Sequence, residues 1–151
     1  FLPRMREIFA ECGVAFVLLP HLKNSGVNGA VKWVSEDRVV LAMNNRGLDA
    51  DKFWFSLFHE LGHILLGHIN QPNGTTEEDE KAADSFAKET LIPTEEFNAF
   101  TTQNDFSKAA ICAFAQEKHI LCGVVVGRLQ KEGFINYNRC NDLKTKYTLS
   151  A

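Results

Sequence analysis

Three histidines and one glutamate fall within the eleven-residue stretch FHELGHILLGH, from Phe58 to His68. If this stretch is helical, His59 and His63 lie about 40° apart in projection and one turn apart along the axis, so both rings can reach one point. Two imidazole nitrogens suit Zn²⁺, which binds histidine nitrogen at about 2.0–2.1 Å. Glu60 follows the first histidine around the helix and can accept a proton from water there. This H-E-x-x-H spacing is typical of metal-dependent peptidases.

A catalytic zinc ion takes three protein ligands and keeps one position open, so a third ligand is needed. One peptidase class extends the motif to H-E-x-x-H-x-x-G-x-x-H, but Leu66 and Ile69 occupy the positions that would need glycine and histidine. His68 follows His63 by about 140° around a continuous helix, which predicts that it points away from the metal. We interpret His68 as a helix-end residue that meets the C-terminal dipole, with a role at the rim of the substrate site as the alternative.

A second predicted helix offers the third ligand on a face made of two carboxylates and two alanines. These residues are Glu80, Ala83, Asp84 and Ala87. The small alanines allow a close approach to the histidine helix, and Gly62 between the histidines allows it from the other side. We therefore predict Glu80 as the third ligand. Asp84 is predicted to accept a hydrogen bond from the far ring nitrogen of a ligand histidine, with His59 as the first choice.

Two alternatives compete with this interpretation. The histidines could be satisfied by hydrogen bonds inside a buried helix, without any metal. The acidic run from Glu77 to Glu80 could simply complement the dipole of a helix N-terminus. Glu77 and Glu78 are also candidate ligands, but each lies on a different face of the predicted helix.

Two helices must position these residues. The stretch DKFWFSLFHELGHILLGH, beginning at Asp51, is apolar nearly all around its axis, which indicates a buried helix capped by Asp49 or Asp51. Thr75 and Glu78 fit a capping box that opens the next helix, and Pro93 ends that helix near Leu91.

The remaining pattern predicts an α+β fold, in which a small three-stranded antiparallel sheet packs on a zincin-like helical core with a buried HExxH helix. The predicted strands are Val14–Leu19, Gly29–Val34 and Arg38–Met43, the last two as a hairpin, with a short strand at Phe134–Tyr137. The further predicted helices are Leu2–Cys12, one around Phe106–Phe114, and one around Cys122–Leu129, for which a strand is the rival.

These elements predict one domain over residues 1–138, followed by a peripheral tail over 139–151. Within the domain, the sheet covers about 14–43, the catalytic helices about 51–92 and the C-terminal helices about 105–132. Because the chain begins with Phe1, we expect a piece of a longer protein.

Composition narrows the function classes. A net charge of -3 with interspersed signs argues against direct nucleic-acid binding. No apolar run reaches the roughly 18–20 residues that cross a bilayer, so no membrane association is expected. The cysteines lack a C-x-x-C pair and are expected to be free thiols in a reducing, cytoplasmic compartment. They are Cys12, Cys112, Cys122 and Cys140.

The two motifs together resemble the ImmA/IrrE family of zinc metallopeptidase domains. That family pairs an H-E-x-x-H helix with a downstream E-x-x-A-[ND]-x-F-A-x-x-[LF]-[LM]-x-P helix. The stretch EKAADSFAKETLIP is similar to this pattern and departs from the family at Lys88 and Thr90, neither of which is a predicted site residue. The segment FAQEKHILCGVVVGRLQKEGFI resembles the family's C-terminal helices more weakly. The resemblance implies His59, His63 and Glu80 as ligands of one Zn²⁺ ion, Glu60 as general base, and Asp84 as the partner of a ligand histidine.

The resemblance further implies a zinc-dependent endopeptidase that cleaves a repressor or antitoxin in stress response, mobile-element or toxin–antitoxin regulation. The family also includes versions fused to a helix-turn-helix domain, so a DNA-binding domain can precede this chain. The alternative is a zinc-binding regulatory, sensor or antitoxin module with little or no peptidase activity. For oxyanion or substrate contacts the sequence offers Arg46, His119 and Tyr137, and the strand Arg38–Met43 could bind an extended substrate along its edge.

Overall fold

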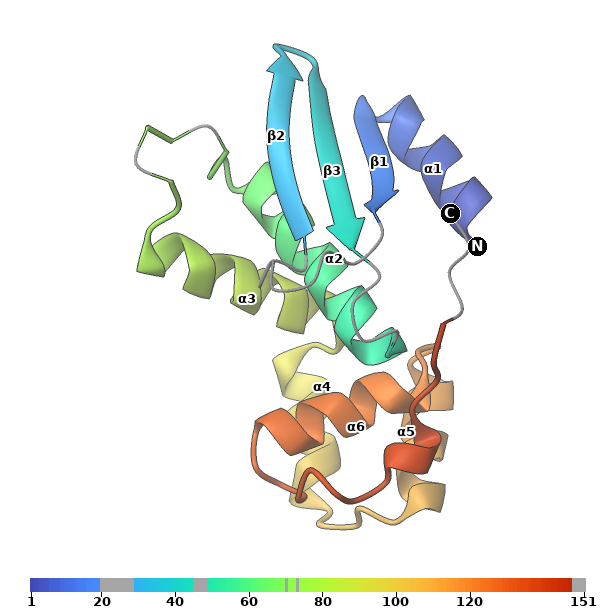
Figure 1. The fold of residues 1–151 in the computed structure, drawn as a ribbon. Helices are drawn as coiled ribbons and strands as arrows, with labels where there is room; N and C mark the ends of the chain where they lie inside the picture. The colour runs from blue at the N-terminus through green and yellow to red at the C-terminus, as the bar shows by residue number, and fades with distance from the viewer. Residues whose placement is uncertain (20–28, 45–48, 70, 73, 148–151) are drawn as a thin grey trace.

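The computed structural model describes residues 1–19, 29–44, 49–69, 71–72 and 74–147. Its helices are α1 (Leu2–Glu11), α2 (Ala50–Leu65), α3 (Glu77–Leu91), α4 (Thr94–Thr102), α5 (Lys108–Glu117) and α6 (Cys122–Lys131). Its strands are β1 (Val14–Leu19), β2 (Gly29–Ser35) and β3 (Arg38–Asn44), and Asn141–Leu143 form a short 3₁₀ helix. Figure 1 shows the sheet, α1, α2 and α3 in one half of the molecule and α4, α5 and α6 in the other. The predicted α+β class is confirmed.

The sheet has the strand order β1-β3-β2. β2 and β3 form the predicted antiparallel hairpin, with Ser35 opposite Arg38, but β1 pairs with β3 in parallel. The sheet is therefore mixed, because β1 lies beside the second strand of the hairpin, which runs in the same direction as β1. Since β3 is paired on both edges, the prediction that its edge could receive an extended substrate is wrong.

The sheet buries one face against α1 and α2. Alternate residues of β1 and β3 are buried, and Phe53 and Leu57 of α2 join the same core. Alternating burial is expected when only one face of a sheet is covered. This core fixes α2, and with it the H-E-x-x-H motif, beneath the strands.

A second core lies among α4, α5 and α6. Helix α4, which the sequence did not predict, starts directly after Pro93 and buries Phe97 and Phe100. The segment Cys122–Lys131 is helical, which settles the choice between helix and strand. The predicted strand Phe134–Tyr137 is wrong, since the chain forms turns and bends there. Ile135 still packs into this core.

The last described residues, 145–147, contact the first turns of α2. The backbone N–H of Ala50 donates to the carbonyl oxygen of Thr145 at 2.8 Å, and the indole N–H of Trp54 donates to the hydroxyl of Tyr147 at 2.7 Å. The segment as far as Tyr147 therefore contacts α2, and residues 148–151 lie outside the described part of the chain.

The cysteines and the apolar segments of the chain bear on its compartment and on membrane association. All four cysteines are free. In the described ranges, no single helix is long and apolar enough to cross a bilayer. Helices α5 and α6 together have sufficient length and apolar composition, but they are bent by 115° relative to each other.

Candidate metal centre

Helix α2 approaches α3 closely at Gly62. A Cβ atom at Gly62 would lie 3.2 Å from the Cα of Ala83 and 3.2 Å from the ring of Phe86, which leaves no room for a larger residue without movement. Ala83 and Ala87 are both fully buried. The close approach predicted from small residues is therefore present at Gly62 and Ala83.

The first turn of α3 places Glu80. The capping box is formed by Thr76 and Asp79, one residue later than the predicted Thr75 and Glu78. Thr75 donates its hydroxyl to Glu80 Oε1 instead, at 2.5 Å. This bond, and then the nearby His63 and His59, hold the pKa of Glu80 below its usual value, so the carboxylate is ionised near neutral pH.

Three potential metal ligands converge from the two helices. The Nε2 atoms of His59 and His63 are 3.0 Å apart, and Glu80 Oε2 and Oε1 lie 3.3 and 3.5 Å from them, respectively. Ligands in a tetrahedron around zinc at about 2.0–2.1 Å would be about 3.3 Å apart. Two imidazoles and one carboxylate at this spacing fit a metal ion. Among the described residues, His59, His63 and Glu80 form the cluster that could hold a metal ion.

Asp84 lies behind His59. Its Oδ1 is 2.8 Å from His59 Nδ1, so the hydrogen bond predicted from the spacing on α3 is present. Because a carboxylate can only accept, the proton sits on Nδ1 and the lone pair of Nε2 faces Glu80 and His63. Lys131 of α6 approaches the other oxygen of Asp84 at 3.9 Å.

Glu60 is buried beneath the first residue of β2. A Cβ atom at Gly29 would lie 2.6 Å from Glu60 Cγ and 2.8 Å from its Oε1, so the strand backbone lies directly against the carboxyl group. Burial raises the pKa of Glu60 to about 7; His59 opposes this shift and Glu80 adds to it. A pKa near 7 suits a group that takes and returns protons near neutral pH.

The prediction that His68 points away from the metal is wrong. Helix α2 ends at Leu65, and Gly67 then takes a φ of +76°. The angle of about 100° per residue in a helix therefore does not give the direction of His68. The backbone N–H of His68 donates to the carbonyl of His63 at 3.0 Å, and that of Gly67 donates to Ile64 at 3.3 Å. These two bonds form a Schellman motif, for which the glycine was the signal in the sequence. The turn brings His68 Nδ1 to 3.1 Å from His63 Nδ1.

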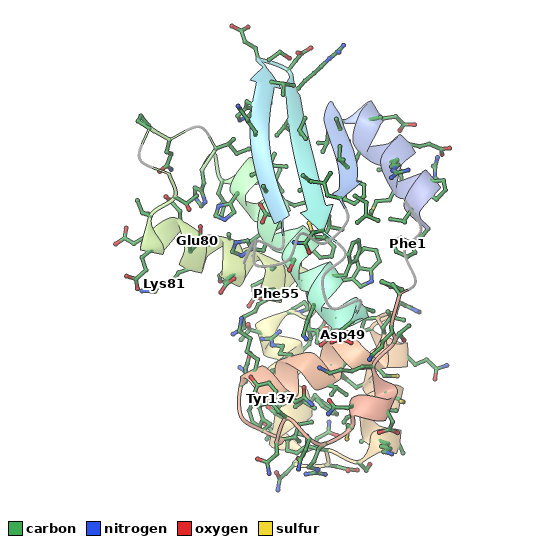
Figure 2. All side chains as sticks on the ribbon, viewed as in Figure 1. Phe1, Asp49, Phe55, Glu80, Lys81 and Tyr137 are labelled. Atoms are coloured by element: carbon green, nitrogen blue, oxygen red, sulfur yellow. The ribbon has the colours of Figure 1, made fainter. Side chains whose placement is uncertain are left out.

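The other candidates lie elsewhere. Glu77 is exposed and pairs with Lys81 at 2.6 Å rather than approaching the histidines. Arg46 lies outside the described residues. His119 is exposed in the turn after α5, and Tyr137 is 70% exposed. Figure 2 shows Tyr137 in the α4–α6 half of the molecule, well apart from Glu80. The roles of Arg46, His119 and Tyr137 stay predictions.

A helix with H-E-x-x-H and a second helix that supplies a carboxylate form a site of the metallopeptidase type, with three residues that could hold a metal ion. Comparison with known families matches residues 17–130 to the IrrE N-terminal-like domain of peptidase family M78, and the chain belongs to this family. The matched region contains both motifs. A comparison with curated proteins gave no match.

Proposed function

We propose that this chain is a zinc-dependent endopeptidase domain that cleaves a protein partner such as a repressor or antitoxin. The observation that carries the proposal is the convergence of His59, His63 and Glu80 beside a buried Glu60 whose pKa is raised to about 7. A purely structural zinc site is closed by four protein ligands, whereas three ligands beside a carboxyl group fit a catalytic site.

The three ligands would hold the ion through His59 Nε2, His63 Nε2 and a carboxylate oxygen of Glu80. When bound, zinc polarises a peptide carbonyl as a Lewis acid and lowers the pKa of water towards about 7. Of the other residues of the site, Asp84 orients a ligand and Glu60 transfers a proton. Asp84 holds His59 in the tautomer that leaves Nε2 available.

Glu60 carries the proton transfer. It takes a proton from the attacking water and returns it to the amine that leaves when the peptide bond breaks. Its burial supports both halves of this transfer, because a carboxyl group with a pKa near 7 is readily protonated and readily deprotonated. The contact with Gly29 restricts where the carboxyl group can point.

The exposure of the site favours a polypeptide substrate over an enclosed small molecule. The Glu80 side chain is 48% exposed, and the metal ligands do not line the 860 Å³ cavity that lies between α2 and α6. Among the described residues, β2 is paired along one edge only. We propose that an extended substrate adds to the free edge of β2, because this strand begins directly over Glu60.

The proposal also covers the compartment and the regulatory role of the protein. A cytoplasmic role in bacterial stress response, mobile-element or toxin–antitoxin regulation rests on the family resemblance. A partner encoded beside this gene is the first substrate to test.

The test is cleavage of that neighbouring gene product by the zinc-loaded protein. Glu60→Gln should bind zinc like the wild type but lose about 10²–10⁴-fold in cleavage rate. Glu78→Gln, an exposed change on α3, should cleave normally. If the wild type binds zinc without cleaving, the regulatory alternative is favoured; cleavage by Glu60→Gln at the wild-type rate would contradict the mechanism.

A further inference from the structure

We infer that His68 is a positioning residue that, together with Asp79, fixes the ring of His63 for metal binding. This inference rests on the proposed metal site and adds to it a second hydrogen-bonded connection between α2 and α3. The observation behind it is the contact between the Nδ1 atoms of His63 and His68, which a continuous helix would not allow.

The hydrogen bonds admit one consistent set of tautomers. His63 Nε2 faces His59 Nε2 at 3.0 Å and must offer a lone pair to bind metal, so the proton of neutral His63 sits on Nδ1. That proton is donated to His68 Nδ1 at 3.1 Å, which leaves the proton of His68 on Nε2. His68 Nε2 lies 3.3 Å from Asp79 Oδ1, and a carboxylate oxygen is the acceptor that this N–H needs.

Both outer partners are held in place by backbone structure. His68 is fixed by the Schellman motif at the end of α2, through its own N–H and the left-handed conformation of Gly67. Asp79 is fixed by the capping box, in which its Oδ2 accepts from the backbone N–H of Thr76 at 2.8 Å. The other oxygen, Oδ1, lies 3.3 Å from His68 Nε2, and the side chain of Gln71 also hydrogen-bonds to this carboxylate.

The connection is largely shielded from water. The side chains of His68 and Asp79 are 11% and 18% exposed, so water competes weakly for the bond between them. His59 and His63 are thus each oriented by a carboxylate of α3, His59 directly by Asp84 and His63 through the ring of His68. The capping box that starts α3 has a second role, since it anchors the chain that orients a ligand on α2.

Losing such an outer partner typically lowers metal affinity by 10–100-fold. We expect this loss in His68→Leu, which fills the space but cannot accept a hydrogen bond. His68→Gln, whose amide oxygen can accept from His63 Nδ1–H, should recover at least part of the affinity. Leu66→Ala, an exposed change in the same turn, is the matched control and should bind zinc like the wild type.

The experiment measures Zn²⁺ affinity by chelator competition and records the visible absorption spectrum of the Co²⁺-loaded protein. Circular dichroism of the metal-free variants checks that each is folded. The inference predicts weaker zinc binding and an altered cobalt spectrum for the Leu variant, with the Gln variant closer to the wild type. Equal affinity of the Gln, Leu and wild-type proteins would overturn it, whereas a wild type that binds no zinc would overturn the proposed function instead.

Discussion

The two halves of this molecule pack helices in opposite ways. Between α2 and α3, Gly62 lies against Ala83 and Phe86, and the buried side chains of α2 include the titratable Glu60 and His63. Among α4, α5 and α6 the fully buried residues include the large, apolar Phe97 and Leu129. The buried polar side chain of that half, Gln130, is neutral and donates to backbone carbonyls.

The residues of the predicted metal site and the apolar core of α4–α6 therefore lie in different halves of the molecule. Small residues bring two backbones close enough for ligands from both helices to meet, but they bury little apolar surface. The helices of the α4–α6 half bury mainly apolar side chains and bear no predicted metal ligand, whereas the apolar core of the other half lies between the sheet and α2. Substitutions in the α4–α6 half should therefore lower stability without changing zinc affinity, whereas substitutions at the α2–α3 contact should change zinc affinity.

Phe97→Ala should have the largest effect on stability. The ring is fully buried, packs at 5.8 Å from the ring of Phe134 and lies under the guanidinium of Arg128 at 4.1 Å. Its loss should lower the free energy of unfolding by about 3–5 kcal/mol, measured by urea denaturation. Phe134→Ala, at a 41% exposed ring of the same cluster, should cost less. Zinc affinity of the folded Phe97 variant should match the wild type; a selective loss of zinc binding would contradict the separation.

The buried Glu60 should make the metal-free protein less stable as pH rises. Its pKa is about 7 in the folded protein and near 4.5 when exposed, so between these values the folded state holds the extra proton. The free energy of unfolding of the wild type relative to Glu60→Gln should therefore fall from about pH 4.5 to pH 7, by on the order of 3 kcal/mol.

Urea denaturation of both proteins in chelator, across this pH range, measures that difference. The histidines are common to both proteins, so their titration largely cancels. A difference that stays constant, or that rises with pH, would show that Glu60 is not held in a desolvating environment.

Gly62→Ala and Gly123→Ala form a matched pair for the smallest effect. Each adds one methyl group within a helix, 3.2 Å from the Cα of Ala83 in the first case and 3.1 Å from the Cα of Lys144 in the second. Both gain up to about 1 kcal/mol of helix propensity, which offsets the cost of overpacking. Only Gly62→Ala displaces α3, so only this variant should lose zinc affinity, on the order of tenfold. Equal zinc binding by the two variants would contradict the account of the α2–α3 contact.

The sequence was informative where spacing within one helix decides geometry. The positions of His59 and His63, and the pairing of Glu80 with Asp84 on one face, follow from 3.6 residues per turn. His68 was misplaced because that periodicity was continued past Gly67, where the helix ends. The capping box shifted by one residue because Thr75 with Glu78 and Thr76 with Asp79 both fit the pattern, and the contact of Thr75 with Glu80 distinguishes them only in the folded chain.

Contacts between distant segments were harder to predict. The parallel pairing of β1 with β3 depends on which strand of the hairpin lies beside β1, and no local pattern encodes that choice. The contact of Gly29 with Glu60 likewise joins a strand residue to a helix residue that lies 31 positions later in the sequence. Helix α4 was missed because it is short and follows Pro93 directly.

The most direct test of the central claim, that two helices share one metal site, is the zinc stoichiometry and affinity of Glu80→Gln compared with Glu77→Gln. These neighbouring carboxylates lie in the same first turn of α3, but only Glu80 approaches the histidines. The account predicts one zinc ion per chain in the wild type and in Glu77→Gln, and a large loss of affinity in Glu80→Gln. Undiminished zinc binding by Glu80→Gln, or no stoichiometric binding by the wild type, would contradict it.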